Sequence, residues 1–201
     1  MILVLTGGIG SGKSVAAGIL NETFGYPVYD TDSSVKRLYL TDDSLLDDIE
    51  ADAGCSFRDE NGEFSSSLMA QYIFSTPGAV GRVESRVFPV LLKDFERWMA
   101  ECGSDNVVFE SATILEKPYF RNFGDVVIIV DAPLDVRVAR AMERDGATYE
   151  GVMSRVSRQK LMNDISDGRN LPEDAYICRN DGSLSQLRNR LKEIIENIIN
   201  K

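Results

Sequence analysis

The chain has no histidine among its 201 residues, so the side chain most often used as a general base near neutral pH is missing. Imidazole is also excluded as a metal ligand and as the partner of a nucleophile. A general base must therefore be aspartate, glutamate or another residue. The three cysteines, Cys55, Cys102 and Cys178, are odd in number and widely spaced, which fits neither a disulfide framework nor a zinc site. They are typical of reduced cysteines in a cytosolic protein.

Basic residues are outnumbered by acidic ones, 22 to 32, which gives a net charge of −10. This balance argues against nucleic acid as the main partner, because phosphate backbones are bound by clustered lysine and arginine. No apolar run approaches the length of a membrane span, and the first residues carry neither a basic flank nor a small-residue cleavage site. We therefore expect a soluble, cytoplasmic protein that binds neither membranes nor nucleic acid. The sequence leaves the oligomeric state open.

The most informative segment is GGIGSGKS at residues 7–14, which satisfies the phosphate-binding pattern G-x-x-x-x-G-K-[ST]. Its glycines let the backbone curl around an anion, so that N–H groups converge on phosphate oxygens at the start of a helix. The apolar run before it predicts a buried strand, and residues 14–20 predict the required helix. This context disfavours the alternative of a glycine-rich turn beside a core lysine. The motif predicts a nucleoside triphosphate site in which Lys13 reaches the phosphates and the Ser14 hydroxyl takes one Mg²⁺ position.

Apolar runs alternating with helical patterns predict the fold. The expected strands are residues 2–6, 27–30, 106–110, 126–131 and 175–178. Most of these runs are nearly continuous, which is typical of strands covered by helices on both faces. The last helix, at residues 184–199, carries an apolar stripe that is expected to face the core. We expect an α/β/α sandwich of the P-loop NTPase type with a five-stranded parallel sheet.

The connection over about residues 32–104 is far longer than a parallel crossover needs, so we expect a helical insertion there. Helical spacing predicts helices at residues 68–74 and 89–99, with a turn at residues 59–63. Ligands of open α/β sheets bind beyond the carboxyl ends of the strands, so this insertion is expected to select a second substrate. We interpret its acidic segment, residues 42–52, as a solvated helix face rather than a metal cluster.

A second insertion, at about residues 137–169, is rich in positive charge. It carries Arg137, Arg140, Arg144, Arg155, Arg158 and Lys160. Spacing places the first three on one helix and the others on the next helical stretch. We predict a small helical lid whose arginines close over a transferring phosphoryl group, the alternative being a solvated helix with ordinary ion pairs. The core is then formed by about residues 1–31, 105–136 and 170–201.

Carboxylates follow two of the predicted strands. Asp30 and Asp32 lie at the carboxyl end of the second strand and are the leading candidates for general base, because an aspartate can accept the proton of an attacking hydroxyl. We favour Asp32, which begins the insertion, while Asp30 could hold a Mg²⁺-bound water or cap the next helix. Capping without chemistry is the alternative for either residue. Glu110 closes the third predicted strand, where a Mg²⁺ role and a structural role are both open.

Together these features resemble the dephospho-coenzyme A kinase family, in the expected order over nearly the whole chain. The resemblance rests on residues 5–14, on Asp30 to Asp32 with Lys36 and Arg37, and on residues 59–64, 73–77, 137–146, 155–159 and 180–182. It implies that residues 1–201 are a single kinase domain. It also implies ATP-dependent phosphorylation of the ribose 3′-hydroxyl of dephospho-CoA to give CoA and ADP, the last step of CoA biosynthesis.

By matched position, the resemblance also implies roles for particular residues. Lys13 and Arg140 would stabilise the transferring group, Asp32 would be the base, and Ser14 would bind Mg²⁺. The residues implied in ATP binding are Gly8, Ile9, Gly10, Ser11, Gly12, Lys13, Ser14 and Val15, with Asn180 near the adenine. The long insertion resembles the region that binds the CoA part of the acceptor.

Departures from the family pattern lie in the acceptor half. The usual His-Pro is Phe88-Pro89, the Pro-Leu-Leu-x-Glu run appears at residues 112–116, and serines at residues 65–67 replace an expected arginine. These departures concern acceptor contacts and not the phosphoryl-transfer residues. The alternatives are a P-loop kinase for another small metabolite, such as a nucleoside, nucleotide or sugar acid, and, more remotely, a nucleotide-dependent regulatory switch.

Overall fold

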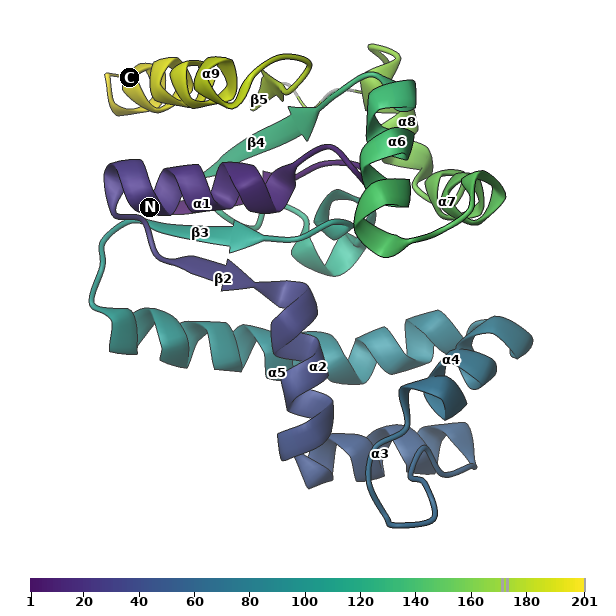
Figure 1. Ribbon diagram of the computed structural model, residues 1–201. Helices are drawn as coiled ribbons and strands as arrows, with labels where there is room; N and C mark the ends of the chain where they lie inside the picture. Colours follow the sequence, from purple (N-terminus) through teal and green to yellow (C-terminus); the bar gives the residue numbers. More distant parts are fainter. Residues whose placement is uncertain (171, 173, 201) are drawn as a thin grey trace. The chain divides into compact units, whose positions relative to one another are not determined.

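The computed structural model describes residues 1–170, 172 and 174–200, and the chain divides into two compact units (Figure 1). One, here called the sheet unit, comprises Met1–Tyr29 and the chain from Ser104 onward. The other, the helical unit, comprises Asp30–Gly103. No helix in the described part of the chain is both long and apolar enough to cross a membrane.

The sheet unit is built on a five-stranded parallel sheet in the order β2-β3-β1-β4-β5. Its strands are β1 Ile2–Thr6, β2 Val28–Asp30, β3 Val107–Glu110, β4 Val126–Asp131 and β5 Ala175–Arg179. All five predicted strands are confirmed, with bounds that differ by one residue at three ends. β1 is the central strand, so the loop that follows it leaves the middle of the sheet.

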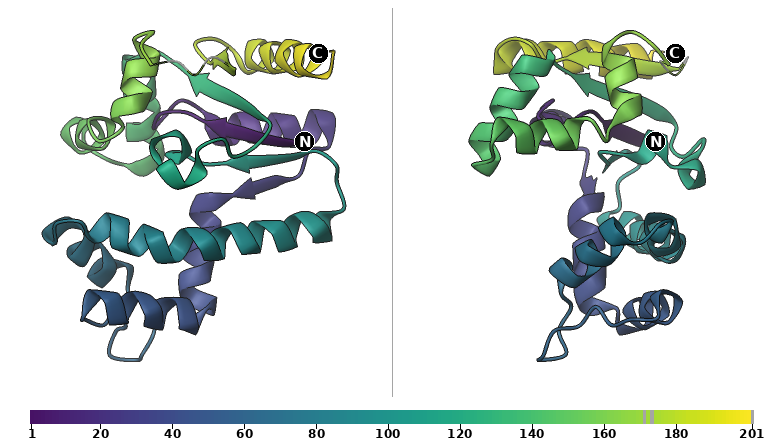
Figure 2. Two further views of the ribbon diagram at one scale, coloured as in Figure 1. Left: turned by 180° about the vertical axis from the view of Figure 1, so that it is seen from behind. Right: turned by 90° about the vertical axis from the view of Figure 1, so that its right-hand side faces the viewer.

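Helices cover both faces of the sheet. The helices of this unit are α1 Lys13–Phe24, α6 Leu134–Asp145, α7 Tyr149–Val156, α8 Lys160–Ser166 and α9 Leu184–Ile199, with short 3-10 turns η1 Ile114–Glu116 and η2 Pro118–Phe120. α1 and α9 pack on one face, and Leu20, Leu191 and Ile195 are fully buried there. α8 lies on the other face (Figure 2). There Met162 and Ile165 of α8 pack against Ile129 of β4. This layering confirms the predicted sandwich.

Two sequence predictions for this unit were wrong in detail. One helical stretch was expected to carry Arg155, Arg158 and Lys160, but α7 ends at Val156 and α8 begins at Lys160. Arg158 therefore lies in the turn between two short helices. The predicted bounds of α9 are confirmed, yet Leu184 of its apolar stripe is exposed, because it is the first residue of the helix. Ser183 and Gln186 form a capping box that fixes this start.

The helical unit contains α2 Thr31–Thr41, α3 Asp43–Ala53, α4 Ser66–Ser75 and α5 Ala79–Cys102. The helix predicted at residues 89–99 begins ten residues earlier, at Ala79. Pro89 inside a helix removes one backbone hydrogen bond and favours a break. Here apolar residues continue at a spacing of four across the proline, and Val83, Val87, Leu91 and Phe95 are all buried. Packing of this face keeps α5 continuous.

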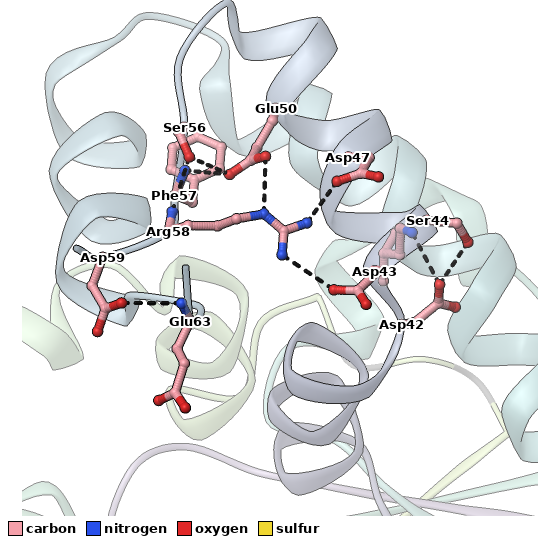
Figure 3. Close-up of polar contacts among 11 residues, drawn as sticks. Asp42, Asp43, Ser44, Asp47, Glu50, Ser56, Phe57, Arg58, Asp59 and Glu63 are labelled. Carbon is pink, nitrogen blue, oxygen red and sulfur yellow. Dashed lines mark hydrogen bonds and ion pairs between the residues drawn. The ribbon is translucent and has the colours of Figure 1, made fainter. Parts of the chain in front are cut away.

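The acidic face of α3 is neutralised by arginines. Arg58 contacts Asp43 at 3.1 Å, Asp47 at 2.6 Å and Glu50 at 3.4 Å (Figure 3). Arg86 of α5 binds Asp52 at 2.6 Å. These ion pairs hold two segments against the acidic face of α3. One is the loop that follows α3, and the other is α5. The segment at residues 42–52 therefore has a structural role.

Glu50 also receives hydrogen bonds from the Phe57 N–H at 2.6 Å and the Ser56 hydroxyl at 2.8 Å. Burial alone would raise the pKa of Glu50, but these hydrogen bonds and the charge of Arg58 outweigh it and hold the pKa below its ordinary value. A carboxyl with a lowered pKa in the folded state contributes stability above its ordinary pKa, and this contribution is lost as the pH falls through the folded value.

We predict that Glu50→Gln lowers the free energy of unfolding at pH 7 and that its difference from the wild type shrinks on acidification below about pH 4, the range in which an ordinary glutamate is protonated. Urea unfolding at several pH values measures this difference. Glu60→Gln, which changes an exposed glutamate in the same unit, is the control and should have little effect. A Glu50→Gln deficit that stays constant with pH would contradict the assignment.

Candidate active site

The phosphate loop connects β1 to α1 and contains three glycines, Gly7, Gly10 and Gly12, in conformations that other residues avoid. Gly10 has a φ of 74° and Gly12 a φ of 97°, both in the left-handed region. Gly12 is also the N-cap of α1 and has no side chain that could cap the first-turn N–H groups. Such a helix start is suited to bind an anion. The strand, loop and helix predicted around the motif are confirmed.

A hollow of about 360 Å³ opens at this loop, within the sheet unit. Its lining residues are Gly10, Gly12, Lys13, Ser14, Val15, Arg140, Glu143 and Arg144. The structure thus brings Arg140 of α6 to Lys13 and Ser14. The role that the family resemblance implies for Arg140 and Lys13 at the transferring group stays a prediction. A larger hollow of about 600 Å³ lies along η1 and η2 but contains none of the predicted site residues.

Glu110, whose role the sequence left open, lies beside the Ser14 hydroxyl. Ser14 Oγ donates to Glu110 Oε1 at 2.9 Å, and Glu110 is buried at the end of β3 in register with Leu5 of β1. A hydroxyl and a carboxylate are oxygen donors of the kind that Mg²⁺ prefers, and Mg²⁺ usually binds few protein groups beside phosphate and water. Among the described residues no cluster of three or more His, Cys, Asp or Glu is placed to form a complete protein cage. The pair therefore fits a nucleotide-bound Mg²⁺.

The cations of the predicted lid are in different environments. Arg144 and Arg155 both bind the carboxylate of Asp145, at 2.6 and 2.8 Å. Hydrogen bonds from Arg144 and then Arg155 hold the pKa of Asp145 far below its ordinary value. Arg144 and Arg155 thus form ordinary ion pairs, which was the alternative to a role over the phosphoryl group. Arg140 donates to the carbonyl oxygen of Asn180 at 3.0 Å while it lines the hollow.

Arg137 is not an exposed lid residue. It is 1% exposed, and its Nε donates to the carbonyl oxygen of Ile9 at 3.1 Å. Burial lowers the pKa of its guanidinium, and the charge of Asp131 offsets part of this effect. A Cβ on Gly8 or Gly10 would collide with Arg137. The side chain therefore packs against the phosphate loop, and it is not among the residues that line the hollow.

Asn180 contacts the same loop. Its amide Nδ2 donates to the Ser11 carbonyl oxygen at 2.8 Å, and the residue is 7% exposed. The family resemblance implies that Asn180 lies near the adenine, and that contact stays a prediction. Ser11 is fully buried, and the Ile9 side chain packs against a small core formed by α6 and α7.

Of the two carboxylates at the end of β2, Asp30 is the cap of α2. Its side chain accepts from the N–H groups of Asp32 and Ser33, at 3.0 and 3.2 Å. Asp32 lies in the first turn of α2 with an exposed side chain. Both residues belong to the helical unit. The capping role therefore falls on Asp30, and the role of Asp32 as the base stays a prediction.

Gln159 was not assigned a role from the sequence. Its Oε1 accepts the N–H of Ile9 at 2.7 Å, across a separation of 150 residues. Gln159 ends one of the segments that carry the family resemblance, residues 155–159. No local sequence pattern predicts this pairing, because the two residues are 150 positions apart.

We predict that Gly10→Ala raises the KM for ATP by about tenfold or more, because the new Cβ meets the Arg137 carbonyl oxygen at a φ that alanine disfavours. Gly18→Ala is the matched control, because nothing lies within 4 Å of its added Cβ in α1. That change should leave the KM unaltered and stabilise the helix by up to ~1 kcal/mol. Steady-state kinetics and thermal unfolding of both variants measure these effects, and equal KM values would contradict the tight fit.

Comparison with known proteins shows the family of this chain. The sequence profile of the dephospho-CoA kinase family matches residues 1–186. Dephospho-CoA kinase of Porphyromonas gingivalis is 42% identical over 158 residues, which are 78% of this chain and 76% of that protein.

Solved structures show the same fold. The Thermus thermophilus protein TT1252 superposes with a TM-score of 0.81 at 26% identity, covering 98% of this chain and 97% of that one. Dephospho-CoA kinase from Campylobacter jejuni superposes with a TM-score of 0.56 at 19% identity, covering 98% and 96%. With the profile match over most of its length, the chain belongs to the dephospho-CoA kinase family.

Proposed function

We propose that this chain transfers the γ-phosphoryl group of ATP to the ribose 3′-hydroxyl of dephospho-CoA, giving CoA and ADP. The observation that carries the proposal is the hollow at the phosphate loop, where Lys13, Ser14 and Arg140 meet in a chain of this family. A kinase needs little covalent chemistry from its protein, because positioning and charge stabilisation supply most of the rate. A cytoplasmic location stays a prediction from the sequence.

The donor half consists of the loop and α6. Free backbone N–H groups of the loop at residues 8–15 would bind the ATP phosphates, since the loop ends in the uncapped start of α1. The N–H groups of Ile9 and Ser11 are bonded within the protein and are not among them. Lys13 and Arg140 line the same hollow and would offset the negative charge that spreads over the transferring group. The lid segment, about residues 137–169, would exclude water from this hollow.

Ser14 and Glu110 would hold Mg²⁺, Ser14 directly and Glu110 through the hydroxyl or a bound water. When bound with the nucleotide, the ion neutralises charge on the β- and γ-phosphates.

The acceptor half is proposed to be the helical unit, which corresponds to the predicted insertion at about residues 32–104. Asp32 would accept the proton of the ribose 3′-hydroxyl as its oxygen attacks. Its support is an exposed carboxylate in the first turn of α2 that does not serve as the cap. The family departures at Phe88-Pro89 and residues 65–67 also fall in this unit, so we expect its acceptor contacts to differ in detail from the family pattern.

We predict that dephospho-CoA stimulates ADP formation from Mg²⁺-ATP, whereas nucleosides, nucleotides and sugar acids do not. A coupled ADP-release assay across these acceptors measures the preference. Stimulation by one of the other metabolites, without stimulation by dephospho-CoA, would show that the acceptor is wrong. Dependence of turnover on Mg²⁺ is tested in the same assay by chelation.

The role of Asp32 as the general base can be tested by substitution. Asp32→Asn should lower kcat by roughly 10²–10⁴-fold while ATP binding is largely kept, because the amide cannot accept the hydroxyl proton. Asp30→Asn is the matched variant, and asparagine caps helices about as well as aspartate, so its kcat should stay within a few-fold of the wild type. A much larger loss of kcat in Asp30→Asn than in Asp32→Asn would assign the base to Asp30.

A further inference from the structure

Two side chains hold the phosphate loop by its carbonyl oxygens. Arg137 Nε donates to Ile9 at 3.1 Å, and Asn180 Nδ2 donates to Ser11 at 2.8 Å. The donors come from different elements, since Arg137 lies on α6 and Asn180 follows β5. Both residues are more than nine-tenths buried. Neither Arg137 nor Asn180 is among the residues that line the hollow at Lys13 and Ser14.

Because the peptide bond is planar, a carbonyl oxygen that is held in place also fixes the direction of the N–H group of the following residue. In a planar trans peptide the C=O of one residue and the N–H of the next point in opposite directions. The described chain has no cis peptide bond. When the Ile9 C=O points out to Arg137, the N–H of Gly10 points the other way, and the same holds for Ser11 and the N–H of Gly12. Gly10 and Gly12 both line the hollow.

The loop fits closely on these two residues. A Cβ on Gly10 would collide with the backbone carbonyl oxygen of Arg137, and a Cβ on Gly12 would collide with the side-chain amide of Asn180. The loop backbone therefore lies close against both residues at these two glycines. The hydrogen bonds fix the orientation of the two peptides, and the close contacts limit movement of the loop toward Arg137 and Asn180.

Arg137 is itself held by polar partners. Its Nη1 donates to Ser166 Oγ at 3.3 Å, and Ser166 Oγ donates to Asp131 Oδ1 at 2.6 Å. Its Nη2 is buried without a hydrogen-bond partner among the described residues. Burying a guanidinium with an unpaired N–H is costly, and an apolar side chain of similar volume would often fill such a space at less cost. The arginine therefore contributes something beyond packing, and its bond to Ile9 is the contact that reaches the loop.

We propose that Arg137 and Asn180 are positioning residues that turn the N–H groups of Gly10 and Gly12 toward the phosphates of ATP. The proposal rests on the ATP site proposed above. Ile9 supplies an internal comparison, because its own N–H is already bonded to Gln159 at 2.7 Å and so points away from the hollow.

The first test uses the unaltered protein and follows its backbone amide resonances by NMR during titration with Mg²⁺-ADP. We expect the amide protons of Gly10 and Gly12 to shift downfield, as those of Lys13 and Ser14 do, and that of Ile9 to change little. Shifts at Lys13 and Ser14 without shifts at Gly10 and Gly12 would overturn the positioning proposal and leave the ATP site standing. No response anywhere in residues 8–15 would overturn both.

The second test separates hydrogen-bond donation from charge at Arg137. Arg137→Met removes both and should raise the KM for ATP about tenfold, the effect of one lost hydrogen bond, with the KM for dephospho-CoA within about twofold. Arg137→Gln keeps an N–H donor without the charge and should restore most of the difference. Arg121→Met removes the charge of an exposed arginine in the same unit and is the control.

A purely structural role would lower the unfolding temperature of Arg137→Met and its kcat while the KM for ATP stays unchanged, which would overturn the proposal. Equal KM increases in the Gln and Met variants would also overturn it, because the charge and not the donated hydrogen bond would then be what matters.

Discussion

The contact between the phosphate loop and Arg137 is the interaction on which the donor site depends. It joins a loop at one end of the chain to a helix more than a hundred residues later, since the Ile9–Arg137 bond spans 128 positions. Arg140 lies one helical turn further along α6 on the same face. With Arg137 buried under the loop, Arg140 reaches the hollow beside Lys13. The burial of one arginine thus places the other at the hollow.

Charge distribution explains how a chain with a net charge of −10 can hold a triphosphate. Much of the acidic surface is locally paired, as Asp43, Asp47 and Glu50 are by Arg58 in the helical unit. In the sheet unit Asp131 and Asp145 bind arginines in the same way. Lys13 and Arg140 line a hollow to which the start of α1 adds the positive end of its helix dipole. Local charge, and not the net charge, governs binding there.

The strands and the phosphate loop could be predicted from sequence because both are local. A buried parallel strand is a continuous apolar run, and the loop needs fixed residues at fixed spacing. The start of α5 could not, because the local signal of Pro89 was outweighed by packing on both sides of it. The role of Arg137 could not either, since helical periodicity groups it with Arg140 and Arg144 without showing which side faces a distant loop. Ser14 and Glu110, 96 residues apart, meet only when β1 and β3 pair.

The proposed reaction transfers a phosphoryl group to one oxygen of one acceptor, the ribose 3′-hydroxyl of dephospho-CoA. The most direct measurement is ³¹P NMR, with mass spectrometry, of the product formed from dephospho-CoA and Mg²⁺-ATP. A product that gains one phosphoryl group as a 3′-phosphomonoester on the adenosine ribose is predicted. Unchanged dephospho-CoA beside ADP and free phosphate, or a phosphate on any other oxygen, would contradict the assignment.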